Sequence, residues 1–352
     1  MTILSSAYNA YIVALESTYN TDAVNAQLIA NTDVTYLGIN NGGDITPVGT
    51  PFTPDRARAS QDGVASTFVR SHSEVNLPIE MTGGQGTANT PSYGNVLRAA
   101  GFIETIGASS TEYVLGTPSA DSISIYKYYR NLTDTNWRLK RATGVLLNMS
   151  LSGNAGEAPV LTFAGMGASY LDLSTPGAYF GTNGYPALNG SGGAITYTGD
   201  ATADNGERLM CVGATITFGA TNIPSSTTTL DIAMAVSAIN TQQGNPLASR
   251  IIRTRTGVSN ANGSLGVESS DSMAGYTVLA AAVLANTVGT LTMIYAGPTR
   301  KVTVVSNVQF TNRLVERDTG GAMAFDAPFN VVGNFAAHPF GDNSVKMTYS
   351  LV

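Results

Sequence analysis

A strict alternation of apolar and polar residues constrains this chain more than any other feature. Val75, Leu77, Ile79 and Met81 are apolar, and the residues between them are polar or proline. Successive side chains of a β-strand point to opposite faces of a sheet, so this pattern is typical of strands with one buried face. Similar alternation marks residues 145–151, 212–218, 302–310 and 345–351, and further strands are expected at 122–130, 160–164, 228–236, 290–295 and 322–332. We therefore predict a mainly β fold, an antiparallel β-sandwich or partial barrel.

Prolines and helical spacings refine this prediction. Pro78 has no amide hydrogen, so its strand is expected to lie at an edge or to be interrupted there. Residues 91–100 have helical spacing, with Thr90 as candidate N-cap, Pro91 as first helical residue and Gly101 just after the end. Residues 273–285, with Asp271 near their start, predict a second helix or, alternatively, a buried pair of strands. One or two helices should therefore flank the sheets.

Three stretches rich in Gly, Ser, Asn or Pro predict long loops, at residues 38–62, 165–205 and 240–272. We expect a single domain of two β-rich halves, about 1–164 and 209–352, with an insertion at 165–208. The halves echo each other, because residues 145–163 and 302–332 both read as strand, acidic glycine turn and strand, each after a basic patch and a helix. A duplicated half-domain and two unrelated halves are both compatible with this pattern.

The chain is unusually poor in charge. Only 12% of its 352 residues are charged and its formal net charge is −6, whereas soluble domains carry roughly 25% charged residues. Because 43% of the residues are hydrophobic, the chain should fold, and its acidity argues against a nucleic-acid reader. No apolar run is long enough to span a membrane, and Met1-Thr2-Ile3 does not begin a secretory signal. A surface with so few charges suggests that other chains cover much of it.

The sequence offers few candidates for chemistry, and we expect no catalytic, cofactor-binding or metal site. His72, His338 and Cys211 are interpreted as structural residues, and one cysteine and two histidines give no zinc spacing. The sequence leaves open the alternative of a calcium site made from Asn and Asp residues in loops. The Gly83–Gly86 run lacks the further residues of a phosphate loop and is interpreted as a turn. Two basic clusters, Arg138-Lys140-Arg141 and Arg250-Arg253-Arg255, favour bonds to neighbouring subunits over nucleic-acid contact.

Several sequence segments resemble those of tail tube (major tail) proteins of long-tailed bacteriophages. Leu15-Glu-Ser-Thr-Tyr-Asn-Thr-Asp22 is similar to that family's E-x-x-Y-G-T-D start, and Pro91-Ser-Tyr-Gly-Asn-Val-Leu-Arg-Ala-Ala-Gly-Phe102 resembles its P-x-L-G-x-L-L-R-A-x-G-F helix. Ile125-Tyr-Lys-Tyr-Tyr129, residues 139–144 and Gly156-Glu-Ala-Pro159 resemble its Y-x-Y-x-D-G, G-A-x-G and G-E-x-P stretch. The resemblance covers residues 12–170 well and the rest loosely. Asn20 stands where glycine is common, residues 131–136 replace a simple turn, and the chain is long for this family.

The resemblance implies a structural virion protein without enzymatic activity. Six subunits would form a ring with a continuous inner β-barrel, and the rings would stack into a hollow tail tube that conducts DNA during ejection. Copies of the chain, tail completion, baseplate and tape-measure proteins would be its partners. Double-stranded DNA would pass transiently, no membrane or cofactor would be involved, and assembly would occur in the bacterial cytoplasm. We expect a neutral-to-negative bore, because phosphate contacts with cations would retain DNA; a bore lined by the Arg138 and Arg250 clusters would contradict this.

Two other function classes fit the same composition. A decoration or baseplate protein of a virion would share the β-rich, weakly charged character. A carbohydrate-binding β-sandwich would need exposed aromatic side chains beside carboxylates, and Tyr170, Asp172, Tyr179 and Phe180 form the best candidate patch. An enzyme is the weakest alternative, because the chain lacks convergent ionisable groups.

Overall fold

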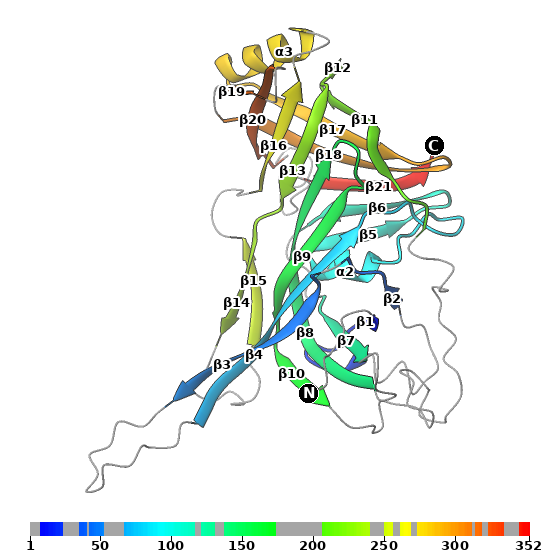
Figure 1. The fold of residues 1–352 in the computed structure, drawn as a ribbon, viewed down its shortest axis with the longest axis vertical. Helices are drawn as coiled ribbons and strands as arrows, with labels where there is room; N and C mark the ends of the chain where they lie inside the picture. Colours follow the sequence, from blue (N-terminus) through cyan, green and yellow to red (C-terminus); the bar gives the residue numbers. More distant parts are fainter. Residues whose placement is uncertain are drawn as a thin grey trace, which may run out of the picture.

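We describe the fold from a computed structural model of the chain. The described residues are 8–23, 35–40, 42–52, 67–116, 121–130, 137–173, 206–239, 250–255, 261–268, 273–311, 314–318, 323–333 and 345–352. The prediction of a mainly β, antiparallel fold is confirmed (Figure 1). His338, Asp271, Tyr179, Phe180 and most of the 165–208 stretch lie outside the described residues.

Eight strands form one continuous antiparallel sheet, here called the front sheet, which runs the length of the molecule (Figure 1). The strands follow one another as β3 (Asp44–Phe52), β4 (Thr67–Glu80), β9 (Val160–Gly167), β8 (Trp137–Asn154), β13 (Ser225–Asp231), β16 (Asn262–Glu268), β20 (Met323–Val331) and β19 (Val315–Asp318). The pairing of β8 with β13 joins the N-terminal half of the chain to the C-terminal half.

Two further sheets lie behind the front sheet. The back sheet contains β12 (Thr221–Asn222), β11 (Met210–Phe218), β17 (Val288–Ala296), β18 (Arg300–Phe310), β21 (Val345–Leu351), β6 (Ser110–Leu115) and β5 (Phe102–Ile106). The lower sheet contains β2 (Thr35–Leu37), β1 (Tyr8–Leu15), β7 (Ile123–Arg130), the first part of β8 and β10 (Ser169–Leu173). The buried side chains between the sheets form one large apolar cluster that draws on both halves of the chain.

Strand β8 belongs to two sheets because it changes direction at Gly144. Residues 139–143 pair with β10, and residues 146–152 pair with β9. Gly144 has a φ of +62°, and a Cβ there would lie 2.8 Å from the Ala168 side chain. A glycine is therefore needed where the strand passes from the lower sheet to the front sheet.

The first predicted helix is shorter than expected. Helix α2 spans Gly94–Ala99 and begins three residues after Pro91, with Tyr93 at its N-cap position and no side-chain cap. Thr90 instead bridges to Gln85 across the preceding loop, so the prediction of Thr90 as N-cap is wrong. The end is as predicted, because Gly101 has a φ of +100° and donates its N–H to the Arg98 carbonyl.

The second predicted helix is present as α3 (Met273–Leu284), and the alternative of two buried strands is wrong. It lies at the upper end of the molecule (Figure 1). Asn286, with a φ of +50°, follows its end and donates its N–H to the Val283 carbonyl. The described helices contain no segment long and apolar enough to cross a membrane.

The prediction of uninterrupted long loops was wrong in three places. Strand β3 lies within 38–62, where Pro47 and Pro51 are tolerated because β3 pairs, among the described strands, with β4 alone. The 240–272 stretch contains β16 and β15 (Arg250–Arg255), and β10 lies within 165–205. The single strand predicted at 228–236 is instead β13 and β14 (Met234–Ile239), because Ala233 adopts a φ of +48° between them.

The expectation for Pro78 is confirmed. Strand β4 pairs with β9 through this position, whereas its pairing with β3 ends at Asn76. The Pro78 carbonyl accepts the Asn40 N–H at 2.8 Å on the β3 side. In an antiparallel strand the N–H and C=O of a residue point to the same side, so the missing proline N–H faces the side where the ladder has ended.

Candidate functional surface

The front sheet exposes one face built mostly from uncharged side chains. Strand register places the outward residues of its six central strands in shared cross-strand rows, such as Asn148 beside Ala164 and Ser152 beside Thr229. The residues between them point inward and are buried. Uncharged polar outward positions are Asn76, Thr162, Asn148, Ser150, Ser152, Asn154, Thr227, Thr229, Asn262, Ser264 and Asn330.

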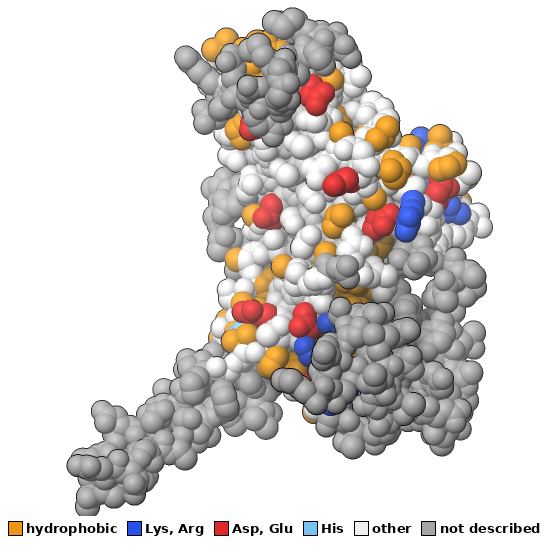
Figure 2. All heavy atoms as spheres, viewed as in Figure 1, with side chains coloured by type: hydrophobic (Ala, Val, Ile, Leu, Met, Phe, Trp, Pro, Cys, Tyr) orange, Lys and Arg blue, Asp and Glu red, His pale blue; other side chains and the backbone are white. Residues whose placement is uncertain are grey.

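The charged side chains on this face are all carboxylates within the described parts of these six strands. They are Glu74, Glu80, Asp231, Glu268 and Asp326. Arg208, which precedes β11, reaches Glu80 from the margin at 3.5 Å. Figure 2 shows this face turned to the viewer, mostly white with scattered red, and with blue side chains near its margins. The sheet therefore presents a broad surface without a central cation.

The outward face of the back sheet differs in charge. Lys301 on β18 and Lys346 on β21 occupy its outward rows, and Lys346 Nζ lies 3.0 Å from Glu112 Oε1 on β6. The two outward faces are thus chemically distinct: cations are present on the back sheet, whereas the parts of the six central strands that belong to the front sheet have none among their described outward positions.

Residues of the Leu15–Asp22 segment are held by a polar cluster. The Glu16 carboxylate accepts hydrogen bonds from the Asn20 N–H (2.7 Å), Ser122 Oγ (2.6 Å), Ser124 Oγ (2.7 Å) and the Gly144 N–H (2.7 Å). Asn20, which stands where glycine is common in the resembled family, has a φ of +60°. Asparagine tolerates this conformation better than most residues, so the departure keeps the turn.

The same segment anchors the Arg138-Lys140-Arg141 cluster. Arg141 Nη1 lies 2.6 Å from Asp22 Oδ2, which also accepts the Tyr126 hydroxyl at 2.5 Å. Burial, followed by the Asp22 charge, raises the pKa of Tyr126 well above its ordinary value. Lys140 and Arg141 both form ion pairs within their own chain, and the expected contacts of this cluster with neighbouring subunits stay a prediction.

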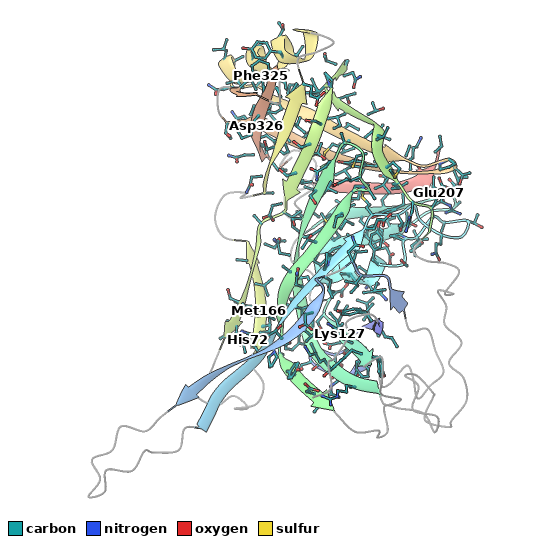
Figure 3. All side chains as sticks on the ribbon, in the orientation of Figure 1. His72, Lys127, Met166, Glu207, Phe325 and Asp326 are labelled. Carbon is teal, nitrogen blue, oxygen red and sulfur yellow. The ribbon has the colours of Figure 1, made fainter. Side chains whose placement is uncertain are left out.

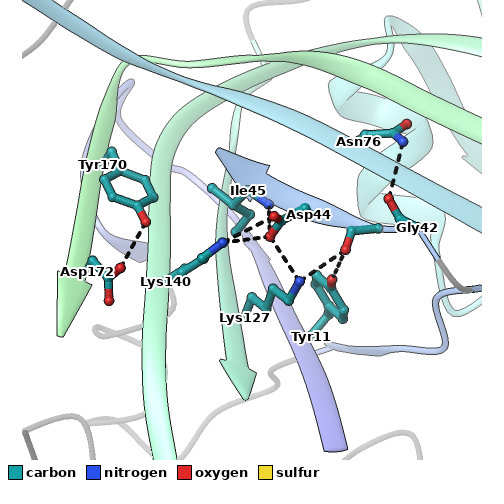
Figure 4. Close-up of polar contacts among 10 residues, drawn as sticks. Tyr11, Gly42, Asp44, Ile45, Asn76, Lys127, Lys140, Tyr170 and Asp172 are labelled. Atoms are coloured by element: carbon teal, nitrogen blue, oxygen red, sulfur yellow. Dashed lines mark hydrogen bonds and ion pairs between the residues drawn. The ribbon is translucent and has the colours of Figure 1, made fainter. Parts of the chain in front are cut away.

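Lys127 and Lys140 both bind Asp44 at the start of β3 (Figure 4). Each Nζ lies 2.9 Å from Asp44 Oδ1, and Lys127 also donates to the Gly43 carbonyl at 3.1 Å. Burial raises the pKa of the Asp44 carboxyl, but the hydrogen bonds from Lys127, Lys140 and the Ile45 N–H together outweigh it and lower that pKa. Both lysines of this cluster are therefore paired with a carboxylate of the same chain.

The Gly83–Gly86 run binds a cation rather than a phosphate. Arg300 Nη1 donates to the carbonyls of Gly84 and Gly86 and to Asn89 Oδ1. A phosphate loop presents N–H groups to its ligand, whereas this loop presents carbonyl oxygens to a guanidinium. A Cβ on Gly84 would lie 1.7 Å from the Asn89 carbonyl oxygen. The interpretation as a turn is confirmed, and its bound partner is Arg300.

The candidates for catalysis and metal binding are dispersed. His72 lies on β4 opposite Val48. Cys211 is the second residue of β11, where burial raises the pKa of its thiol. Figure 3 shows His72 and Lys127 at the lower part of the molecule, Glu207 at one margin and Asp326 near the upper end. Among the described residues, no group of three or more His, Cys, Asp or Glu could hold a metal ion.

A groove of about 540 Å³ lies between the front sheet and the β14–β15 ribbon. Asp44, Glu74, Asn76 and Asn148 line its polar side, and Met166 and Val236 line its apolar side. Ile251 of the ribbon is buried with Leu146 and Ala168, so the ribbon covers part of the front sheet. The side chains of Arg250, Arg253 and Arg255 lie outside the described residues.

The proposed aromatic patch is only partly described. Tyr170 donates its hydroxyl to Asp172 at 3.3 Å, and burial together with the Asp172 charge raises the pKa of Tyr170. The two groups bind each other, which leaves less of their hydrogen-bonding capacity for a sugar.

No protein-family model matches the chain, and no curated protein matches its sequence significantly.

Proposed function

We propose that this chain is a structural subunit of a hollow phage tail tube, assembled in the bacterial cytoplasm as stacked rings. The observation that supports the proposal most strongly is the outward face of the front sheet. Ser, Thr, Asn and carboxylates occupy it, and cations are missing from its described central positions. We assign this face to the bore.

The chemistry of the face suits a channel for DNA. Each cation that neutralises a phosphate adds affinity by counterion release. A bore of hydroxyls, amides and carboxylates repels phosphates or leaves them hydrated, so DNA can slide. Of the cations around this face, Lys127, Lys140 and Arg141 are bound by Asp44 and Asp22, and Arg208 reaches Glu80 at the margin. Arg250, Arg253 and Arg255 belong to β15 of the ribbon that covers part of the face.

The sheet is also suited to ring closure. A continuous antiparallel sheet ends in edge strands that other chains can pair with, and closure into a barrel removes these edges. In the proposed assembly six repeats of one β-sheet unit, the number that the resemblance implies for a ring, surround the bore, and the rings stack along the tube. Tail completion, baseplate and tape-measure proteins would contact its ends and interior.

Electron microscopy of the purified chain tests the proposal. Tubes of uniform bore, with Ser152 of β8 and Thr229 of β13 lining the channel, are expected. Discrete particles that bind only to a preformed capsid or baseplate would favour a decoration or baseplate protein. A monodisperse monomer under all conditions would contradict a tube, and glycan binding by that monomer would favour the carbohydrate-binding alternative.

A further inference from the structure

The two halves of the chain have the same strand topology. Each element of the first half has a counterpart in the second, in the same chain order. The first half contains β1, β2, β3, β4, α2, β7, β8, β9 and β10. Their counterparts are β11, β12, β13, β16, α3, β17, the pair β18 and β19 (together equivalent to β8), β20 and β21. Each half begins with a strand and a short partner, continues with an arm of two strands and a helix, and ends with four strands. The β5–β6 hairpin and the β14–β15 ribbon are additions to this plan.

Every strand pairing within the first plan recurs in the second. β1 pairs with β2 and β7, as β11 pairs with β12 and β17. β8 pairs with β7, β10 and β9, and β18 pairs with their counterparts β17, β21 and β20. β19, which continues β18, extends the pairing with β20. β4 pairs with β3 and β9, as β16 pairs with β13 and β20.

Backbone details at equivalent positions agree as well. Both helices end two residues before a residue of positive φ, Gly101 or Asn286, whose N–H donates to the carbonyl three residues earlier. After β9 the Ala168 N–H donates to the Thr143 carbonyl at 2.8 Å, and after β20 the Val332 N–H donates to the Asn307 carbonyl at 2.7 Å. Agreement in order, pairing and turn geometry indicates two copies of one structural unit.

The junction between the two units is visible within the chain. The end of β8, the last front-sheet strand of the first unit, pairs with β13, the first front-sheet strand of the second. The equivalent strands at the two ends of the front sheet are β19 and β3. Among the described residues, β19 pairs only with β20 and β3 only with β4.

We infer that β19 of one copy docks against β3 of the next, as β8 docks against β13, so that each chain supplies two of the units around the bore. The register of this contact follows from the β8–β13 pairing, if β19 takes the place of β8 and β3 takes the place of β13. It places Val315 opposite Thr46 and Arg317 opposite Asp44. Because the two joined edges are different, the contact is head-to-tail and can close a ring. The inference rests on the proposed tube, whose six units then require three chains.

Side chains of the same chain occupy hydrogen-bonding groups at the free edge of β3. The Gly43 carbonyl accepts hydrogen bonds from the Tyr11 hydroxyl (2.6 Å) and from Lys127, and the Asp44 carboxylate accepts the Ile45 N–H (2.8 Å). Pro47 also removes a donor from the strand. Such features prevent unprogrammed pairing of exposed edges. Docking of β19 must exchange these side-chain bonds for contacts with the neighbouring copy.

Disulfide trapping in assembled tubes tests the junction. In a Cys211→Ser background, the pair Thr46→Cys and Val315→Cys should crosslink between chains after oxidation, giving a ladder that closes at three chains. The pair Ser152→Cys and Thr229→Cys, which lie opposite each other at the visible junction, should crosslink within one chain and leave monomers. Thr46→Cys alone should give no ladder.

Other outcomes separate the inference from the proposed function. A ladder that closes at six chains, or tubes without interchain crosslinks, would overturn the inference while the tube proposal stands. If the cysteine variants do not fold, image averaging of wild-type tubes decides instead: three chains per ring support the inference, and six overturn it. A wild-type chain that forms no tube would contradict the proposed function and, with it, the inference.

Discussion

Glu16 shows how one carboxylate organises a turn at the residue scale. Its two oxygens accept two backbone hydrogen bonds, from Asn20 and from Gly144 of β8, and two hydroxyl hydrogen bonds, from Ser122 just before β7 and Ser124 within it. Each donor would otherwise lose a partner in a partly buried environment, and unsatisfied donors are costly. The residue thus ties the Leu15–Asp22 segment to the point where β8 changes sheets.

Replacing Glu16 tests this role. In Glu16→Gln one accepting oxygen becomes an amide donor that faces other donors, so we expect the free energy of unfolding to fall by about 2–3 kcal/mol. Urea denaturation at pH 7 measures the change. Glu74→Gln, at an exposed outward position of β4, is the matched control and should change stability by less than about 0.5 kcal/mol. Equal losses in both variants would contradict the assignment.

Asp44 gives a prediction of pH dependence. Because its folded-state pKa lies below the ordinary value of 3.8, the folded chain binds a proton at this site more weakly than the unfolded chain. Its stabilising contribution is therefore fully present above pH 3.8 and is lost as the pH falls through the folded-state pKa. Asp44→Asn should be less stable than wild type at pH 7, and the gap should narrow below pH 3.8. A gap that widens on acidification in equilibrium unfolding would refute this sign.

At the scale of elements, the loop between β4 and α2 contacts the turn between β17 and β18. Arg300 at the start of β18 inserts its guanidinium among the carbonyls of the glycine loop. Glu207 accepts the N–H groups of Thr299 (2.7 Å) and Arg300 (3.2 Å) on the same turn. The two elements are remote in sequence, so this contact helps fix the front and back sheets relative to each other.

Two glycines in this loop provide a matched pair of variants. Gly84→Ala would place a methyl group 1.7 Å from the Asn89 carbonyl oxygen, so the loop that binds Arg300 must rearrange, and we expect the free energy of unfolding to fall by about 3 kcal/mol or more. Gly86→Ala meets no atom within 4 Å but keeps a φ of +65°, which costs roughly 1 kcal/mol. Thermal unfolding of both variants measures the difference, and a larger loss in Gly86→Ala would exclude a steric role for Gly84.

At the scale of the whole molecule, the proposed bore predicts how added cations should act. Ser152→Lys with Thr229→Lys places two lysines opposite each other on the outward face of the front sheet. Tubes of this variant should bind duplex DNA at low salt and release it as salt rises. Thr105→Lys, on edge strand β5 of the back sheet, is the control and should leave DNA recovery unchanged. Equal DNA retention by both variants would argue against the assigned bore.

The sequence by itself determined the local character of the molecule. Period-two alternation located the strands around Leu77, Leu147 and Val304 because side-chain direction in a strand depends only on local backbone geometry. It also located α3 and the glycine that ends α2. It predicted loops where β3, β10, β15 and β16 form, and it gave no strand for β1, β2, β5, β6, β12 and β19. It also placed Thr90 wrongly, because prolines, glycines and caps are decided by which neighbouring segment lies alongside.

Only the tertiary structure decided which strands are neighbours. No local pattern could show that β8 joins β13, that Arg300 occupies the glycine loop or that Lys140 and Arg141 are neutralised within the chain. These contacts join residues about 80 to 220 positions apart, and their energy depends on geometry that forms only when the sheets assemble. The equivalence of the two halves is likewise a property of pairing order, which side chains of different sequence can satisfy equally well.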